Sequence, residues 1–160
     1  MSKTRNNISK IYSFLKNGIL GFLICYYFKT LVYSLLGSGI AFKNNFIELS
    51  PARNTGSAFS LFNESNLALA IIASVVVIFI ICYFLNNLKT IRILDTYALS
   101  FLTAGIVSNT AERFIYGYVT DYFRLTFVDF PIFNMADIYI NIGAGLLIIS
   151  ILFIKRGKHA

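Results

Sequence analysis

Long runs of apolar residues dominate the hydrophobic and polar pattern of this chain. Four segments stand out, at about residues 11–36, 67–85, 93–111 and 138–154. The second and fourth carry no charge, and the second has nineteen residues, close to the roughly 20 that a helix needs to cross a bilayer. Lys16 and Lys29 interrupt the first, and the third carries only Asp95, near its start. The pattern therefore predicts a mainly α-helical integral membrane protein with four transmembrane helices.

The composition supports a membrane protein. With 57% hydrophobic residues, 13% charged residues and a mean hydropathy of +0.70, the chain has too few polar residues to cover a water-soluble fold. A cleavable signal peptide is the alternative for the first segment, but the apolar stretch is too long and no clear cleavage site follows it. We expect a retained first span and one four-span domain over residues 1–160, a length that suits a single domain.

The net charge of +7 has a topological distribution. Nine of the fourteen basic residues precede or enter the first segment, separate the second from the third, or follow the fourth: Lys3, Arg5, Lys10, Lys16, Lys89, Arg92, Lys155, Arg156 and Lys158. These three regions share one side of a four-span protein, so the positive-inside rule places both termini in the cytoplasm. We attribute the charge to membrane topology and expect membrane lipids, but no nucleic acid, among the partners.

Two long connections, at about residues 37–66 and 112–137, fall on the outer side in this topology. Gly37, Gly39, Pro51 and Gly56 prevent a continuous helix in the first, and residues 45–49 alternate as a strand does. Irregular backbone cannot face hydrocarbon, so both connections should lie at the outer surface or line a polar cavity. We expect a small extracytoplasmic unit that contains β-structure.

Small residues and cysteines in the apolar segments indicate packing. Ala104 and Ser108 lie four residues apart, and residues 143–145 read Gly-Ala-Gly, as expected for close contacts between helices. Cys25 and Cys82 are interpreted as buried thiols. The one histidine, His159, is interpreted as a solvated tail residue, and we expect neither a metal nor a cofactor.

Four of the seven carboxylates, Glu112, Asp121, Asp129 and Asp137, lie just ahead of the last apolar segment or at its start. The end of the third segment and the start of the fourth share the outer boundary, and Asp121 lies in the connection between them. Two aspartates that share a site cannot both ionise cheaply, so one can hold a proton while the other activates a water. Carboxylates that only solvate an outer loop explain the spacing nearly as well.

Four motifs carry a resemblance to a known family. In chain order they are Asn54-Thr55-Gly56-Ser57-Ala58-Phe59-Ser60, Ser108-Asn109-Thr110-Ala111-Glu112-Arg113, Gly117-Tyr118-Val119-Thr120-Asp121-Tyr122-Phe123 and Phe133-Asn134-Met135-Ala136-Asp137. Their order and spacing resemble the signature motifs of the lipoprotein signal peptidase (signal peptidase II) family, and the resemblance covers essentially the whole chain.

The resemblance implies a bacterial aspartic endopeptidase of the cytoplasmic (inner) membrane, with its active site near the outer face. Such an enzyme removes the signal peptide from prolipoproteins after a diacylglyceryl group has been attached to the cysteine that becomes the new N-terminus. By motif match, Asp121 and Asp137 take the catalytic positions. The surrounding substrate-binding or supporting positions fall on Asn54, Asn109, Glu112, Arg113 and Asn134.

The chain departs from the family pattern at several positions. Ser108 and Glu112 replace the usual glycine and aspartate of the third-segment motif. In the first segment the family's Asp-Gln-x-x-Lys pattern keeps only Lys29, and Cys25 stands in place of the aspartate. Ser57 replaces an alanine. None of these changes affects the two aspartates.

Two more carboxylates, and two alternative functions, remain to be considered. We expect Asp95 to pair with Arg92, one turn before it, and Asp129 to lie in a loop outside the site. A small proton- or cation-coupled transporter subunit is the main alternative, but it predicts acids deep within a span. A non-catalytic membrane adaptor would explain the hydropathy and leave the ordered motifs unexplained.

Overall fold

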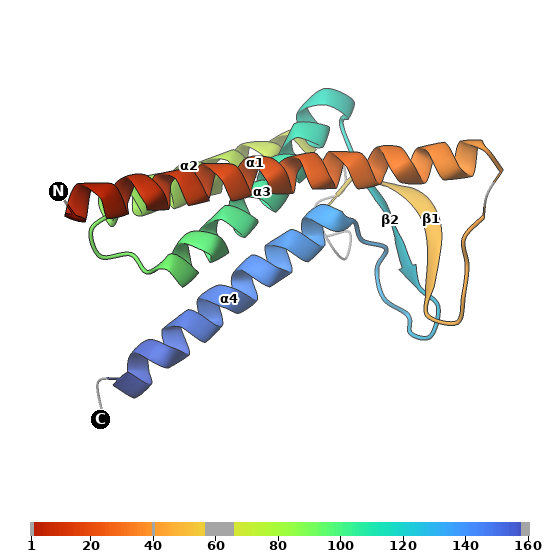
Figure 1. The fold of residues 1–160 in the computed structure, drawn as a ribbon. Coiled ribbons are helices and arrows are strands. Elements are labelled where there is room, and N and C mark those ends of the chain that lie inside the picture. Colours follow the sequence, from red (N-terminus) through yellow and green to blue (C-terminus); the bar gives the residue numbers. More distant parts are fainter. Residues whose placement is uncertain (1, 40, 57–65, 158–160) are drawn as a thin grey trace.

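The computed structural model of the protein describes residues 2–39, 41–56 and 66–157. These residues form four helices and two strands, in the order α1 (Ser2–Gly37), β1 (Ile47–Asn54), α2 (Asn66–Asn86), α3 (Ile93–Tyr116), β2 (Val119–Leu125) and α4 (Met135–Gly157). In Figure 1 the two strands lie at one end of the helix bundle, and both chain termini lie toward the other end. The mainly helical fold with a small β unit agrees with the sequence prediction.

Three of the helices are long and apolar enough to cross a membrane: Thr4–Gly37 within α1, Asn66–Asn86 and Met135–Leu152 within α4. The helix α1 has 36 residues, and at 1.5 Å per residue it is about 54 Å long. It is therefore longer than the roughly 30 Å hydrocarbon layer. It begins at Ser2, well ahead of the predicted start at about residue 11, and ends at Gly37, one residue after the predicted end. The chain is a multi-pass membrane protein.

The helix α3 is long enough to span, with 24 residues, but it is not among the helices whose apolar stretches are sufficient to cross a membrane. It packs against α1, α2 and α4, so its neighbours are helices rather than lipid on most sides. Polar side chains are buried along it, together with the predicted packing residue Ala104: Thr96, Ser100, Ser108 and Thr110. A central position explains why α3 does not meet the composition of a lipid-facing span. The four-span topology stays a prediction.

Glycines allow α3 and α4 to approach closely. A Cβ atom on Gly105 would lie 2.4 Å from the carbonyl oxygen of Ala136, and one on Gly143 would lie 2.8 Å from that of Ala98. Only glycine fits at such distances without a shift of backbone. Of the predicted small residues on α4, Gly143 is therefore a packing residue. Gly145 is not, because no described atom lies within 4 Å of a Cβ built there.

The two cysteines differ in exposure. Cys25 is buried in α1, as predicted, whereas Cys82 is exposed on α2. The prediction of a buried Cys82 is wrong because α2 packs mainly against α3 and leaves much of its surface uncovered. His159 lies outside the described residues.

Polar contacts tie the bundle together at the end nearer the termini. Arg92 and Asp95 form the predicted ion pair, with 3.2 Å between Nε and Oδ2. The Arg92 side chain also donates to the Ser150 carbonyl oxygen of α4, at 2.6 Å, and the Ser150 hydroxyl contacts both members of the pair. Lys10 of α1 donates to the carbonyl oxygen of Leu88, in the turn between α2 and α3, at 3.0 Å. Every charged group in these contacts has a partner.

The two strands pair antiparallel, with Leu49 opposite Phe123 and Ala52 opposite Asp121. One extra residue in β1 between these pairs makes a bulge, which accommodates Pro51, a residue without a backbone N–H. The predicted strand over residues 45–49 is right from Ile47 onward. It begins two residues later than predicted because the Asn44 side chain accepts hydrogen bonds from the N–H groups of Phe46 and Ile47, both at 2.8 Å, and forms a turn there.

Candidate functional site

The strand β2 places Asp121 in a buried position beside β1. The helix α3 ends at Tyr116, Gly117 turns the chain with a φ of 75°, and β2 follows at Val119. Asp121 is 4% exposed and lies opposite Ala52. Since side chains alternate along a strand, Asn54 lies on the same face as Ala52, and its Nδ2 donates to Asp121 Oδ2 at 2.9 Å.

The start of α4 is attached directly to β2. Phe133 and Phe123 exchange backbone hydrogen bonds of 2.8 and 3.1 Å, so the next residue, Asn134, lies beside the strand. The Asn134 Oδ1 accepts from the N–H groups of Ala136, at 2.7 Å, and Asp137, at 3.1 Å. In return, Asp137 Oδ2 accepts from the Asn134 backbone N–H at 2.9 Å. This reciprocal capping box fixes both side chains at the helix start.

Asn134 bonds to both aspartates. Its Nδ2 donates to Asp121 Oδ1 at 2.7 Å, and its backbone N–H donates to Asp137 as described above. Asn134 Nδ2 also donates to Asn109 Oδ1 at 3.1 Å, and Asn109 Nδ2 donates to Asp137 Oδ1 at 2.9 Å. Each of the four carboxylate oxygens therefore accepts a hydrogen bond, and every donor is a neutral amide. The structure brings Asn54, Asn109, Asn134 and the two aspartates into one network.

Burial sets the protonation of Asp121. Loss of water raises the pKa of this carboxyl to about 6, and the negative charge of Asp137 adds to the increase. Hydrogen bonds from Asn54 and Asn134 and the positive charge of Arg113 oppose the increase only in part. Two carboxyl groups joined through Asn134, one of them with a raised pKa, can hold one proton between them and so perform acid–base chemistry near neutral pH.

The two remaining predicted site residues, Glu112 and Arg113, do not contact the aspartates directly in the described part of the chain. Arg113 Nη2 lies 3.4 Å from the carbonyl oxygen of Gly56, beyond the end of β1. Glu112 pairs with Lys29 of α1, with 3.1 Å between Oε1 and Nζ, and its Oε2 accepts from the Thr120 N–H at 2.8 Å. Glu112 therefore supports β2 rather than the carboxyl pair. Ser57, Ala58, Phe59 and Ser60 of the first motif lie outside the described residues.

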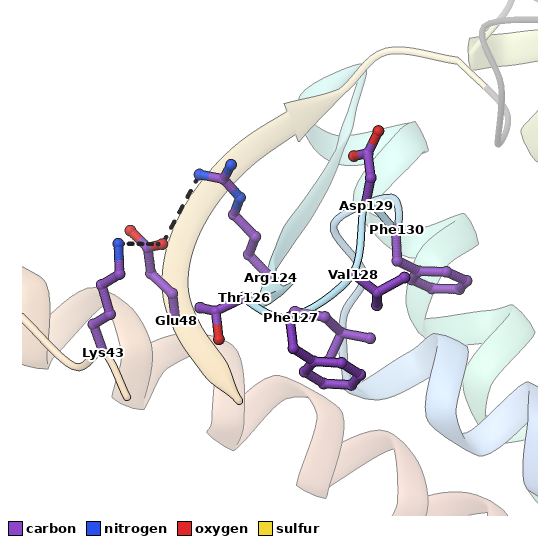
Figure 2. A pocket seen from close by; sticks show the side chains of 9 residues that line it. Lys43, Glu48, Arg124, Thr126, Phe127, Val128, Asp129 and Phe130 are labelled. Atoms are coloured by element: carbon purple, nitrogen blue, oxygen red, sulfur yellow. Dashed lines mark ion pairs between the residues drawn. The ribbon is translucent and has the colours of Figure 1, made fainter. Parts of the chain in front are cut away.

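Asp129 lies outside the site, as predicted. It lines a separate pocket of about 460 Å³ at the far end of the sheet, among side chains of β1, β2 and the loop after β2 (Figure 2). Glu48 lies 3.5 Å from Lys43 and 3.9 Å from Arg124 there, so the two basic groups share a carboxylate. This pocket holds none of the residues of the amide and carboxylate network.

Sequence reasoning did not assign a role to Lys29 or Tyr122. Lys29 is the partner of Glu112, and the Tyr122 hydroxyl accepts from the Met135 N–H at 3.2 Å, which fixes the start of α4. A lysine within an apolar segment is a signal in itself, because such a charge needs a partner. The partner, however, comes from a different helix, and no local pattern identifies it.

The structure resembles solved membrane enzymes. One bacterial membrane enzyme, solved by the in meso method at 2.3 Å resolution, is 28% identical, with a TM-score of 0.74 over 88% of this chain and 90% of that chain. A second, solved by the same method at 1.9 Å resolution, is 25% identical, with a TM-score of 0.75 over 89% of this chain and 94% of that chain. The fold is that of a bacterial membrane enzyme.

Sequence comparison identifies the family. The family described as Signal peptidase (SPase) II matches residues 17–153. A lipoprotein signal peptidase of Campylobacter jejuni is 38% identical over 86% of this chain and 88% of the relative, and one of Fusobacterium nucleatum is 33% identical over 94% and 92%. The chain belongs to the signal peptidase II family, and it is an aspartic endopeptidase of that family rather than a transporter subunit or an adaptor.

Proposed function

We propose that the protein removes the signal peptide from diacylglyceryl-modified prolipoproteins and cuts before the lipid-modified cysteine, with Asp121 and Asp137 as the dyad that activates water. The observation that carries the proposal is the double contact of Asn134, which holds one carboxylate with its side-chain amide and the other with its backbone N–H. This arrangement keeps two acids of one site in a fixed relation without a cation between them.

The two environments suggest a division of roles. Asp121 is the member that holds the proton, since burial raises its pKa to about 6. Asp137 lies in the first turn of α4, where hydrogen bonds from Asn109 and Asn134 orient its carboxylate. With Asp121 as the proton donor, Asp137 takes the role of the base.

Hydrolysis then needs no protein nucleophile. Asp137 takes a proton from water as the oxygen attacks the scissile carbonyl carbon, and protonated Asp121 donates a hydrogen bond to the carbonyl oxygen. The tetrahedral intermediate collapses as its C–N bond breaks, and the proton taken up by Asp137 passes to the departing amine of the cysteine. The second product is the carboxyl end of the signal peptide, and the dyad returns to its starting state.

The supporting residues and the membrane complete the proposal. Asn54, Asn109 and Asn134 hold the carboxylates, and Arg113 adds positive charge near them. Four spans with cytoplasmic termini would place this site near the outer face of the bacterial cytoplasmic membrane, where the apolar helices meet the substrate's signal helix and acyl chains. Residues 1–160 would act as one membrane peptidase domain.

In vitro cleavage of a diacylglyceryl-modified prolipoprotein, beside the same protein without the lipid, tests the function. We expect the parent enzyme to cleave only the modified form, and Asp121→Asn or Asp137→Asn to abolish cleavage while the protein stays folded in detergent. Asp129→Asn is the matched control and should keep parental activity, because Asp129 lies in the separate pocket. Full activity in either dyad variant, or equal cleavage of both substrates, would contradict the proposal.

A further inference from the structure

We propose that Lys29 and Glu112 form a positioning pair that holds the start of β2 and, through it, the carboxyl group of Asp121. The inference rests on the function proposed above and concerns residues that do not contact the dyad. Lys29 comes from α1 and Glu112 from α3, and together with Thr120 of β2 they join three elements.

Both carboxylate oxygens of Glu112 are in use. Oε1 lies 3.1 Å from Lys29 Nζ, and Oε2 accepts from the Thr120 N–H at 2.8 Å. The two side chains are only 12% and 13% exposed, so water screens the pair weakly. Breaking a buried pair by removing one partner leaves an uncompensated charge, which makes the geometry of this contact hard to change.

Two tyrosine rings enclose the ammonium group of Lys29. Nζ lies 5.5 Å from the ring centroid of Tyr26 and 5.1 Å from that of Tyr116, the last residue of α3. Such cation–π contacts strengthen as water is excluded. Lys29 is therefore held from α1 on one side and from the end of α3 on the other, which limits the directions in which it can point.

Glu112 spans the turn that leads into β2. Between Glu112 and Thr120 the chain leaves α3, reverses at Gly117 with a φ of 75°, and enters the strand. Asp121 follows Thr120 directly, and its side chain points to the opposite face of the strand, toward Asn54. Glu112 thus fixes the backbone one residue before the proposed acid and leaves the acid's own hydrogen bonds untouched.

The remaining restraints on Asp121 come from other directions. β1 pairs with β2 along one edge, and Phe133 bonds to Phe123 beyond the acid. The Thr120 N–H contact restrains the start of β2 from α3, whereas the bond between Tyr122 and Met135 restrains the strand from α4, beyond the acid. Loss of the pair should therefore let the start of β2 shift, and a shift of about 1 Å at a reacting group can lower a rate by about 100-fold.

The test compares Glu112→Gln and Lys29→Met in the cleavage assay with the lipid-modified prolipoprotein. Gln keeps an oxygen for the Thr120 N–H but loses the ion pair, and Met keeps the length of the lysine stem. We expect each to lower kcat by about tenfold with little change in KM, and the double variant to lose no more than either single variant, because the two residues act as one unit.

A pH profile separates positioning from a merely structural role. A displaced Asp121 gains water, so the apparent pKa of the dyad should fall by about half a unit or more, and the profile should move to lower pH. The charges facing Asp121 that must stay constant are those of Arg113 and Asp137. Loss of folded protein alone would lower the amplitude of the profile and leave its position unchanged.

Two controls make each outcome decisive. Glu48→Gln removes the ion pairs with Lys43 and Arg124 at the far end of the sheet and should keep the parental kcat and profile. Lys29→Arg, which retains the charge, should keep most of the activity. An unchanged kcat and profile in folded Glu112→Gln, or a loss that matches its loss of folded protein, would overturn the positioning pair. Cleavage by Asp121→Asn in the same assay would instead overturn the proposed function.

Discussion

Two aspartates at opposite ends of the α3–α4 pair have the same local geometry and different surroundings. Asp95, in the first turn of α3, accepts from the backbone N–H of Arg92 at 3.4 Å, and Asp137, in the first turn of α4, accepts from that of Asn134 at 2.9 Å. Asp95 also has the Arg92 guanidinium as an ion-pair partner. The other donor to Asp137 is the neutral amide of Asn109.

The difference shows what converts a helix-capping carboxylate into a reactive one. A cation beside Asp95 compensates its charge, so the group serves as a structural link to Ser150 of α4. In the network of Asp137 the other acid is a second carboxyl, that of Asp121, whose pKa is raised in part by the charge of Asp137, and Asn134 and Asn109 link the two groups by hydrogen bonds. A capping motif alone therefore does not indicate a reactive residue, whereas a capping motif that meets another buried acid does.

Replacing each of the two aspartates in turn by asparagine gives the largest expected effect on activity. Asp137→Asn should lower cleavage by at least about 10³-fold with little loss of stability, because a catalytic base has no substitute nearby. Asp95→Asn should do the reverse: activity per folded molecule within about threefold of the parent, and a loss of about 1–3 kcal/mol in the free energy of unfolding. Equal losses of activity in both variants would show that the two ends do not differ in kind.

Asn134 offers a way to separate capping from catalysis within one residue. Asn134→Ser keeps a side-chain oxygen that can cap α4, but it removes the Nδ2 donor to Asp121 and Asn109. We expect stability within about 1 kcal/mol of the parent and a fall in kcat of about 100-fold, since the Asp121 carboxylate loses one of its two hydrogen-bond donors and keeps only Asn54. Thermal unfolding and single-turnover cleavage on the same preparation measure both quantities. Parental kcat in this variant would remove Asn134 from the mechanism.

The helices can be predicted from the sequence, whereas most of the hydrogen bonds on which these predictions depend require the structure. Apolar segment lengths and the Gly37 break are enough to predict the helices, because each is a local property of the chain. The motif match names Asp121 and Asp137, but the hydrogen bond from Asn54 to Asp121 depends on the register of β1 against β2. That register includes a bulge at Pro51, which no periodicity predicts.

Supporting contacts across helices are the hardest to predict. Glu112 and Lys29 lie on different helices, and only their packing shows that the lysine left from the family pattern pairs with the glutamate. The exposure of Cys82 is equally hard to predict, because it depends on which face of α2 packs against α3. Sequence therefore predicts which residue types gather at this end of the helix bundle, and the fold determines how they are joined.

The raised pKa of Asp121 predicts a pH dependence of stability. Its folded-state pKa of about 6 exceeds the ordinary value of 3.8, so the folded state binds the proton more tightly than the unfolded state. The contribution to stability is fully present below about pH 4 and is lost as pH rises through about 6, an effect on the order of 3 kcal/mol. Thermal unfolding in detergent from pH 4 to pH 8 measures it. The slope should be reduced in Asp121→Asn, and an identical slope in that variant would contradict the assignment.

The smallest expected effects concern the two close contacts between α3 and α4. One contact lies next to Asp137 and the other lies far from it, so only the first should affect activity. Gly105→Ala and Gly143→Ala each force a methyl group against a backbone carbonyl, that of Ala136 or that of Ala98, and overpacking of this kind costs about 1–3 kcal/mol of stability. Ala136 precedes Asp137, so only Gly105→Ala should also lower kcat per folded molecule. Gly145→Ala has room for its methyl group and should change neither quantity. If Gly143→Ala lowered kcat as much as Gly105→Ala, the whole α3–α4 interface, rather than the part near Ala136, would set the position of Asp137.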